Sequence, residues 1–246
     1  MPVCLAGDNS GFSGKLIVTC DATASETTGT TLILGQAASF GGAMDVATAD
    51  GVLLEKYSFI RPEETMTLSA ANRGITINAG GFDVPEGRTL TVAVPLKVAG
   101  TAIKKGAGTL ALGGAVTLAS GSFAIKEGAA KAIADSAVAG LDLTFSDGAA
   151  IALDPDAEIE NGFTGNLSTV NPGEKIALRL ASRPADGRME FTVPVCTVPT
   201  ASGDISELFS VEQPRGYTAQ LVTSTVGECT RYSVHYRRNG FILTFR

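Results

Sequence analysis

Short bursts of alternating residues, separated by glycine-rich steps, constrain this chain more than any other feature. In segments such as 66–69, 75–78, 89–94 and 109–112, an apolar residue alternates with Thr, Ser, Asn or Ala. A period of two is typical of β-strands, whose successive side chains point to opposite faces. The steps between the bursts, among them Gly-Gly, Glu-Gly, Gly-Ala-Gly and Ser-Asp-Gly, have the composition of tight turns. The pattern continues to about residue 153 and predicts an all-β fold.

Strands this short must stack on many neighbours to be stable. A β-sandwich uses longer strands and core aromatics, whereas aromatic residues make up only 6% of this chain and Trp is absent. A parallel β-helix instead combines very short strands, tight corners and inward stacks of Val, Ile, Leu and Ala. We therefore expect a right-handed parallel β-helix, a solenoid whose coils repeat every 20–45 residues. In 128–138, alanine between glycines predicts a corner with one or two helical turns.

Degenerate repeats support the solenoid and carry a family resemblance. The segment from Asn9 to Leu16 is echoed by the segment from Glu160 to Leu167, since both contain Gly-Phe-[Ser/Thr]-Gly before a strand. Between them, residues 104–112 read Lys-Lys-Gly-Ala-Gly-Thr-Leu-Ala-Leu. This run resembles the autotransporter-associated β-strand repeat, and 141–154 is similar to coils that close such passenger regions. The resemblance covers about the first two thirds of the chain. It implies a right-handed parallel β-helix, export and display at the cell surface, without the membrane barrel and without catalytic residues.

The last third of the chain differs in composition and in the length of its expected strands. From Pro155 onward glycine becomes rarer, prolines and arginines become more frequent, and the expected strands are longer. Asn239-Gly240 lies between alternating runs, which predicts a hairpin. We therefore predict β-helix coils over 1–154 and a β-rich cap or small β domain over 155–246, because the end of a solenoid needs a seal of different chemistry.

The charge balance limits the kinds of partner. The net charge is -6, which argues against nucleic acid, because phosphate binding needs a dense basic face. Arginines gather after residue 230 without a carboxylate, at Arg231, Arg237, Arg238 and Arg246. We interpret them as the positive guard of an exposed hairpin edge. No apolar run is long enough to insert into a membrane as a helix.

The cysteines form two couples that are close in sequence, Cys4 with Cys20 and Cys196 with Cys229. Even number and local spacing fit two disulfides in an exported protein, although four cysteines permit three pairings and buried free thiols stay open. Residues 1–7 lack the basic and apolar regions of a signal peptide. We therefore expect any export segment to lie outside this chain.

Few residues offer catalytic or binding chemistry. His235 is the only histidine, and in its alternating run it is expected on an exposed or cap-packed position rather than as a general base. Gly106-Ala107-Gly108 lies at a strand corner and not at a helix N-terminus, so it predicts no phosphate site. Four acidic residues, spaced to share one side of an extended chain, suit either a Ca²⁺ site or a solvated outer face, which we favour. They are Asp154, Asp156, Glu158 and Glu160.

Parallel β-helices also include polysaccharide lyases and hydrolases, which need paired carboxylates in a groove. The nominal pairs in this chain are Asp45 with Asp50, Glu63 with Glu64, and Asp83 with Glu86. None comes with the aromatic platforms that sugar binding usually needs. We therefore assign no catalytic, cofactor-binding or metal residues.

These observations together predict a structural or adhesive function. The chain is expected to be an extracellular, passenger-type β-solenoid, displayed at or released from a bacterial cell surface, with a structural or adhesive role and no catalysis. Its expected partners are glycans or proteins of host or neighbouring cells, and self-association is open. A carbohydrate-active β-helix enzyme is the alternative.

Overall fold

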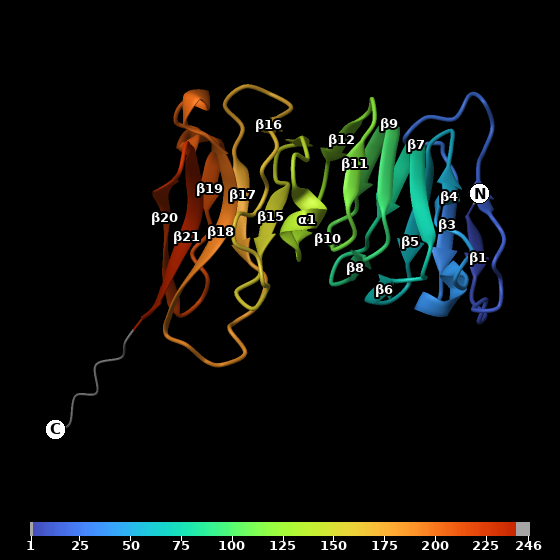
Figure 1. Cartoon of the computed structure of the whole chain (residues 1–246), viewed down its shortest axis with the longest axis horizontal. Helices are drawn as coiled ribbons and strands as arrows, with labels where there is room; N and C mark the ends of the chain where they lie inside the picture. Colours follow the sequence, from blue (N-terminus) through green and yellow to red (C-terminus); the bar gives the residue numbers. More distant parts are fainter. Residues whose placement is uncertain (1, 240–246) are drawn as a thin grey trace.

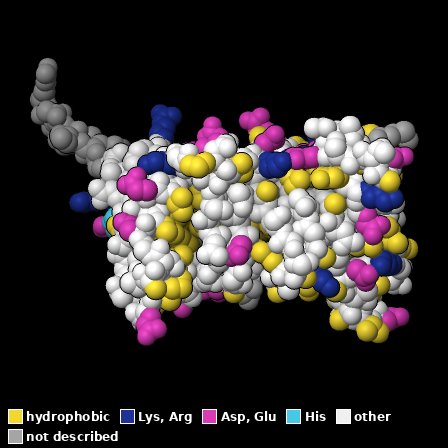
Figure 2. Space-filling view, turned by 90° about the horizontal axis from the view of Figure 1, so that it is seen from above, with side chains coloured by type: hydrophobic (Ala, Val, Ile, Leu, Met, Phe, Trp, Pro, Cys, Tyr) yellow, Lys and Arg dark blue, Asp and Glu magenta, His cyan; other side chains and the backbone are white. Residues whose placement is uncertain are grey.

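The protein is an elongated stack of parallel β-coils closed at one end by an antiparallel sheet (Figure 1; Figure 2 shows the molecule in space-filling form). The structure, a computed structural model, describes residues 2–239. Strands make up 48% and helices 5% of the chain, and the parallel sheets form a solenoid of about six turns. The prediction of an all-β parallel β-helix with a C-terminal β-rich cap is therefore confirmed.

An eleven-stranded parallel sheet covers two faces of the solenoid. Its strands are β1 (Val3–Leu5), β2 (Leu16–Val18), β3 (Thr31–Leu34), β4 (Thr48–Leu54), β5 (Ser58–Pro62), β7 (Arg73–Asp83), β9 (Leu96–Lys105), β11 (Val116–Leu118), β12 (Ser122–Ile125), β14 (Leu143–Phe145) and β16 (Leu167–Thr169). The sheet turns the corner within β7 and β9. Their first halves pair with β4 and β11 and belong to what we call the first face, and their second halves pair with β5 and β12 and belong to the second face.

A seven-stranded parallel sheet forms the third face. It contains β6 (Met66–Leu68), β8 (Thr89–Val92), β10 (Thr109–Leu112), β13 (Ala129–Ala132), β15 (Ala150–Leu153), β17 (Ile176–Leu180) and β19 (Phe209–Val211). Short helices occupy some of the corners and the ends: η1 (Ala37–Phe40), α1 (Asp135–Val138), η2 (Thr200–Ser202) and η3 (Ser206–Leu208). The segment 128–138 thus holds both β13 and one helical turn, α1.

The core is a set of side-chain rows that run along the stack. On the second face the row passes from Leu32 through Ile60 and Phe82, a step of about 20–30 residues per coil. On the third face Leu90, Leu110 and other apolar residues stack in the same way. The alternation of the short strands therefore has the predicted cause: one face of every strand looks into the solenoid.

Glycines build the corner between the first and second faces, because successive coils approach there too closely for a side chain. A Cβ atom on Gly80 would lie 1.9 Å from the carbonyl oxygen of Ser58. The equivalent distance is 1.9 Å from Gly100 to the carbonyl of Asn78, and 2.0 Å from Gly121 to the carbonyl of Gly100. The glycine excess of the sequence thus serves close stacking as well as turns.

The antiparallel cap sheet has the order β18-β21-β20, with β18 (Glu190–Pro199), β20 (Tyr217–Val226) and β21 (Cys229–Arg238). Its inner face puts aromatic rings over the last coil: the Phe191 and Tyr236 rings stack with centroids 5.0 Å apart, and Tyr217 meets Phe191 edge-on. β18 also bonds to the solenoid through Phe163, whose N–H and C=O pair with Val195 and Thr197. The cap thereby continues the core.

The parallel stack extends beyond the boundary expected at residue 154. β17 pairs in parallel with β15, and β19 pairs in parallel with β17. The fall in glycine content after Pro155 therefore marks longer connections and not the end of the coils. The predicted hairpin at Asn239-Gly240 falls at the limit of the described residues, because Gly240 lies outside them. A hairpin is found instead between β20 and β21, with Gly227 at a positive φ of 60°.

Candidate functional site

A shallow groove of about 300 Å³ crosses the outer side of the third face. Its floor follows the register of the parallel strands, with Thr89 beside Thr109 and Thr109 beside Ala129. The chain that leaves β17, at Ala181 and Ser182, also lines it. Small hydroxyl and methyl side chains thus form a flat floor on which an extended chain could lie.

Two ion pairs border this groove. Lys131 Nζ lies 2.9 Å from Asp154 Oδ2, and Arg179 Nε lies 2.7 Å from Glu212 Oε1. Burial alone would raise the pKa of Asp154, but the hydrogen bonds from Lys131 and from the N–H of Asp156 lower it below its ordinary value. Both cations are therefore neutralised by carboxylates of an adjacent coil or its continuation.

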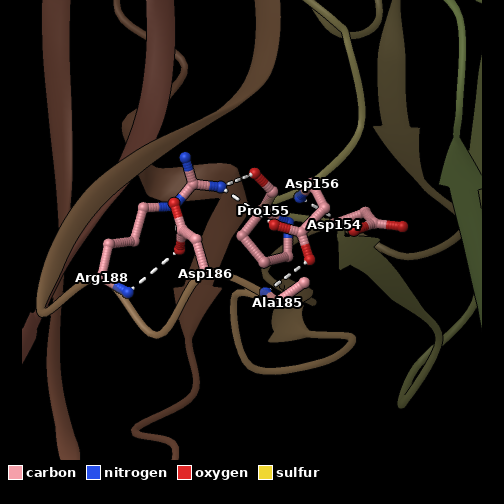
Figure 3. A network of polar contacts seen from close by, with 6 residues as sticks. All are labelled: Asp154, Pro155, Asp156, Ala185, Asp186 and Arg188. Atoms are coloured by element: carbon pink, nitrogen blue, oxygen red, sulfur yellow. Dashed lines mark hydrogen bonds and ion pairs between the residues drawn. The ribbon is translucent and has the colours of Figure 1, made fainter.

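The acidic run after β15 does not form a shared site (Figure 3). Asp154 turns to Lys131, whereas Asp156 accepts hydrogen bonds from the N–H of Ala185 at 2.9 Å and from Arg188 Nη2 at 3.1 Å. The Arg188 guanidinium also donates to the carbonyl of Pro155, and its Nε lies 3.6 Å from Asp186. This network ties the loop before β18 to the corner after β15.

The favoured prediction for the acidic run was a solvated outer face. Glu158 and Glu160 are exposed, but Asp154 and Asp156 are engaged in ion pairs. Within residues 2–239 there is no group of three or more His, Cys, Asp or Glu side chains that could hold a metal ion.

Arg73 is a buried cation whose hydrogen-bond partners are all backbone carbonyls. Its side chain is completely buried, and its guanidinium donates to the carbonyls of Phe12, Gly14, Gly42 and Gly51 at 2.7–3.2 Å. Burial lowers its pKa. The fork of an arginine can serve several acceptors at once, so Arg73 pins the loops of the first coils to β7.

Lys104 plays the same part in the middle of the stack. It is fully buried, and its Nζ donates to the carbonyls of Gly106, Gly108 and Glu127, the last two at 2.6 and 2.7 Å. Burial lowers the pKa of Lys104 to about 8, while the nearby carboxylates of Glu127 and Asp83 raise it. The predicted Gly106-Ala107-Gly108 corner therefore binds a lysine of its own coil.

His235 lies in the middle of the cap sheet, on its outer side. Its Nδ1 is 3.0 Å from Thr192 Oγ1 and its Nε2 is 3.0 Å from Glu190 Oε1, so the ring bridges two residues of β18. Thr192 is directly opposite His235 in the antiparallel ladder. A hydroxyl, an imidazole and a carboxylate in series are the parts of an activated nucleophile, but an acyl-transfer site also needs free N–H donors beside the nucleophile. We interpret this group as a surface hydrogen-bond chain, which is the cap-packed position expected for His235.

The carboxylate pairs considered for glycoside chemistry are scattered. Asp50 forms an ion pair with Lys15, and Asp83 forms one with Arg61, in both cases on neighbouring coils. The remaining members, Asp45, Glu63, Glu64 and Glu86, are exposed.

The four cysteines are free thiols. Cys4 is exposed on β1, and Cys20 donates to the carbonyl of Lys56. Cys196 is fully buried and lies opposite Tyr232, whereas Cys229 lies opposite Pro199. The sequence couples are therefore not disulfides in this structure: Cys4 lies on β1 and Cys20 after the end of β2, and Cys196 and Cys229 face other residues of the cap ladder. Burial raises the pKa of the Cys196 thiol to about 12.

Searches of family models, curated proteins and solved structures found no match to this chain. The autotransporter-type resemblance therefore remains a prediction carried by residues 104–112 and 141–154. None of the helices formed by the described residues is long and apolar enough to cross a membrane.

Proposed function

We propose that this chain is a structural and adhesive β-solenoid that is displayed at, or released from, a bacterial cell surface and performs no catalysis. One observation carries the structural role: charged side chains form ion pairs that link neighbouring coils. Arg61–Asp83 and Lys15–Asp50 bridge neighbouring coils on the outside, and Lys131–Asp154 does so beside the groove.

The inside of the stack supports the same role. Arg73 donates four hydrogen bonds, and Lys104 three, to carbonyls of corner segments, where a regular ladder cannot satisfy the backbone. Coils of a solenoid touch only their neighbours, so each link of this kind opposes local opening of the stack. A rod that resists opening suits a spacer exposed to proteases.

The groove on the third face is the surface we propose for adhesion. Its threonine and alanine floor, bordered by the ion-paired Lys131 and Arg179, offers hydroxyls and methyl groups to an extended glycan or protein segment. Export and surface display rest on the motif resemblance of residues 104–112.

A glycan panel tests the adhesive role and its enzymatic rival together. The purified chain should bind at least one acidic or mucin-type glycan, and Thr109→Arg, which fills the groove, should weaken binding about tenfold or more. Thr117→Arg is the matched control, because Thr117 is exposed on β11 of the first face. Release of reducing ends would overturn the structural role and favour a carbohydrate-active enzyme. Equal binding by the Thr109→Arg variant would overturn the groove assignment.

Surface labelling of intact cells tests display. In cells that express the native gene, a membrane-impermeant amine reagent should label the chain, or the chain should be found in the medium. A chain that is labelled only after the cells are lysed would contradict export.

A further inference from the structure

The outer edge of β20 is the longest unpaired strand edge of the described residues. β20 is the last strand of the cap sheet and pairs with β21 along its whole length, from Tyr217 to Val226. Figure 1 places it at the end of the molecule opposite the N-terminus. On its other side, the N–H of Tyr217 donates to the carbonyl of Pro214 at 3.0 Å, and the N–H and C=O of Ala219 are bound by the side-chain amide of Gln213 at 2.9 and 2.8 Å.

The N–H and C=O of Ala219 point away from β21, and this shows which other residues of β20 have backbone groups on the outer edge. In an antiparallel strand, the N–H and C=O of alternate residues point to the same edge. Leu221, Thr223 and Thr225 therefore point their backbone groups away from β21, in the same direction as Ala219. Every residue from Val222 to Val226 is exposed, so this part of the edge is accessible.

Nothing in the composition of β20 protects this edge. Proteins protect edge strands with charges, prolines, bulges or short length. The segment from Gly216 to Gly227 contains no charged residue and no proline, although 18% of the chain is charged. Its register with β21 is unbroken, whereas β18 has an irregularity between Pro194 and Cys196.

The arginines that the sequence suggested as an edge guard lie elsewhere. Arg231, Arg237 and Arg238 belong to β21, which is the central strand of the cap sheet. For these three arginines that interpretation was wrong, because β21 is paired on both sides, with β18 and β20; Arg246 lies outside the described residues. The strands that end the parallel sheets, β1, β2, β6, β11, β16 and β19, are each 3 residues long. β20 therefore stands out as an edge suited to pairing.

We propose that β20 is the interface for a second copy of this chain, which adds its own β20 in antiparallel register about a two-fold axis at Thr223. In this register Leu221 faces the partner's Thr225, and Thr223 faces the partner's Thr223, so the free backbone groups of both copies satisfy one another. The two cap sheets become one continuous sheet.

The charge pattern of β20 suits pairing with a second copy of the same strand. A two-fold contact brings identical or related residues together, so any charge near the axis would meet its own copy. β20 is free of charge over its whole length. Val222, which is 37% exposed, faces the partner's Ser224, and Val226, which is 41% exposed, faces the partner's Gln220. The pairing thus covers the two exposed valines of the strand.

Sedimentation at several protein concentrations tests the pairing. The wild type should dimerise, and Thr223→Lys, which sets two ammonium groups face to face at the axis, should raise the dimer dissociation constant about tenfold or more. Gln220→Lys is the matched control: it adds the same charge to the same strand, but opposite the partner's Val226, and should leave dimerisation unchanged. Circular dichroism should show that both variants stay folded.

Three results would overturn the proposal. The wild type could remain monomeric up to millimolar concentration, or it could form a dimer that Thr223→Lys does not weaken. A dimer that is lost when the chain is ended after Asn239 would show that residues 240–246, and not β20, make the contact.

Discussion

Replacing Lys104 by methionine tests whether a buried ammonium group closes a corner of the solenoid. Lys104 is fully buried, and burial lowers its pKa from an ordinary value near 10.5 to about 8. Between these values the unfolded chain holds a proton that the folded chain has released. Stability must therefore rise with pH in this window.

The size of the effect follows from the two pKa values. Where the proton difference is complete, the free energy of unfolding rises by about 1.4 kcal/mol per pH unit. Because the folded pKa is about 8, the rise between pH 7.5 and 9.5 amounts to about 2 kcal/mol. The Lys104→Met variant has no proton to release, so it should lack this rise.

Other groups change stability in the opposite direction. Burial raises the pKa of Cys196 to about 12, so the unfolded thiol loses its proton first, and stability falls as pH rises above about 8.5. The raised pKa of Tyr236 has the same sign at higher pH. The useful quantity is therefore the difference between wild type and Lys104→Met at each pH, in which these common terms cancel.

Urea unfolding followed by circular dichroism, at steps from pH 7.5 to 9.5, measures this difference. Lys105→Met is the control, since the Lys105 ammonium lies 3.7 Å over the Phe59 ring on the outside of the second face and contacts the carbonyl of Glu26. Its profile should keep the rise seen in wild type. Parallel profiles for wild type and Lys104→Met would refute the buried-ammonium account.

Three further outcomes are expected. In thermal unfolding, Gly80→Ala should destabilise the chain by about 3 kcal/mol or more, because the φ of Gly80 is 129° and the added Cβ would lie 1.9 Å from a carbonyl oxygen. Gly87→Ala is the control: Gly87 has a φ of 71° but lies in open space, so the substitution should cost about 1 kcal/mol. Arg188→Met should speed proteolytic cleavage of the loop before β18, seen by mass spectrometry, while the protease resistance of the coils stays unchanged. In titration with a thiol reagent and no reductant, Cys4 should react in the folded state and Cys196 only after unfolding; fewer than four thiols in the unfolded chain would reveal a disulfide.

The fold was largely predictable because its cause is local. Alternation over a few residues places Leu90 and Leu110 inside, and the glycines between strands supply the corners. The end of the coils was not predictable in this way. β17 alternates like any strand, and only its pairing with β15 reveals that it belongs to the solenoid and not to the cap. Strand partners are a non-local property that composition does not encode.

The site residues were less predictable, and Lys104 shows why. Sequence alone shows Lys104-Lys105 only as a pair of cations before a glycine corner. Aligning the coils changes this, because Lys104 occupies the inward row between Phe82 and Ile125 of adjacent coils. If every coil had the same number of residues, the sequence could be aligned coil by coil and Lys104 would be seen at an inward position. The number of residues per coil varies, so this alignment cannot be made from the sequence alone. The burial of Arg73 could not be predicted from a repeat in this way, because its acceptors come from three separate segments of the first coils. Irregular coils leave carbonyls without ladder partners, and the buried cations are the means by which this chain satisfies them.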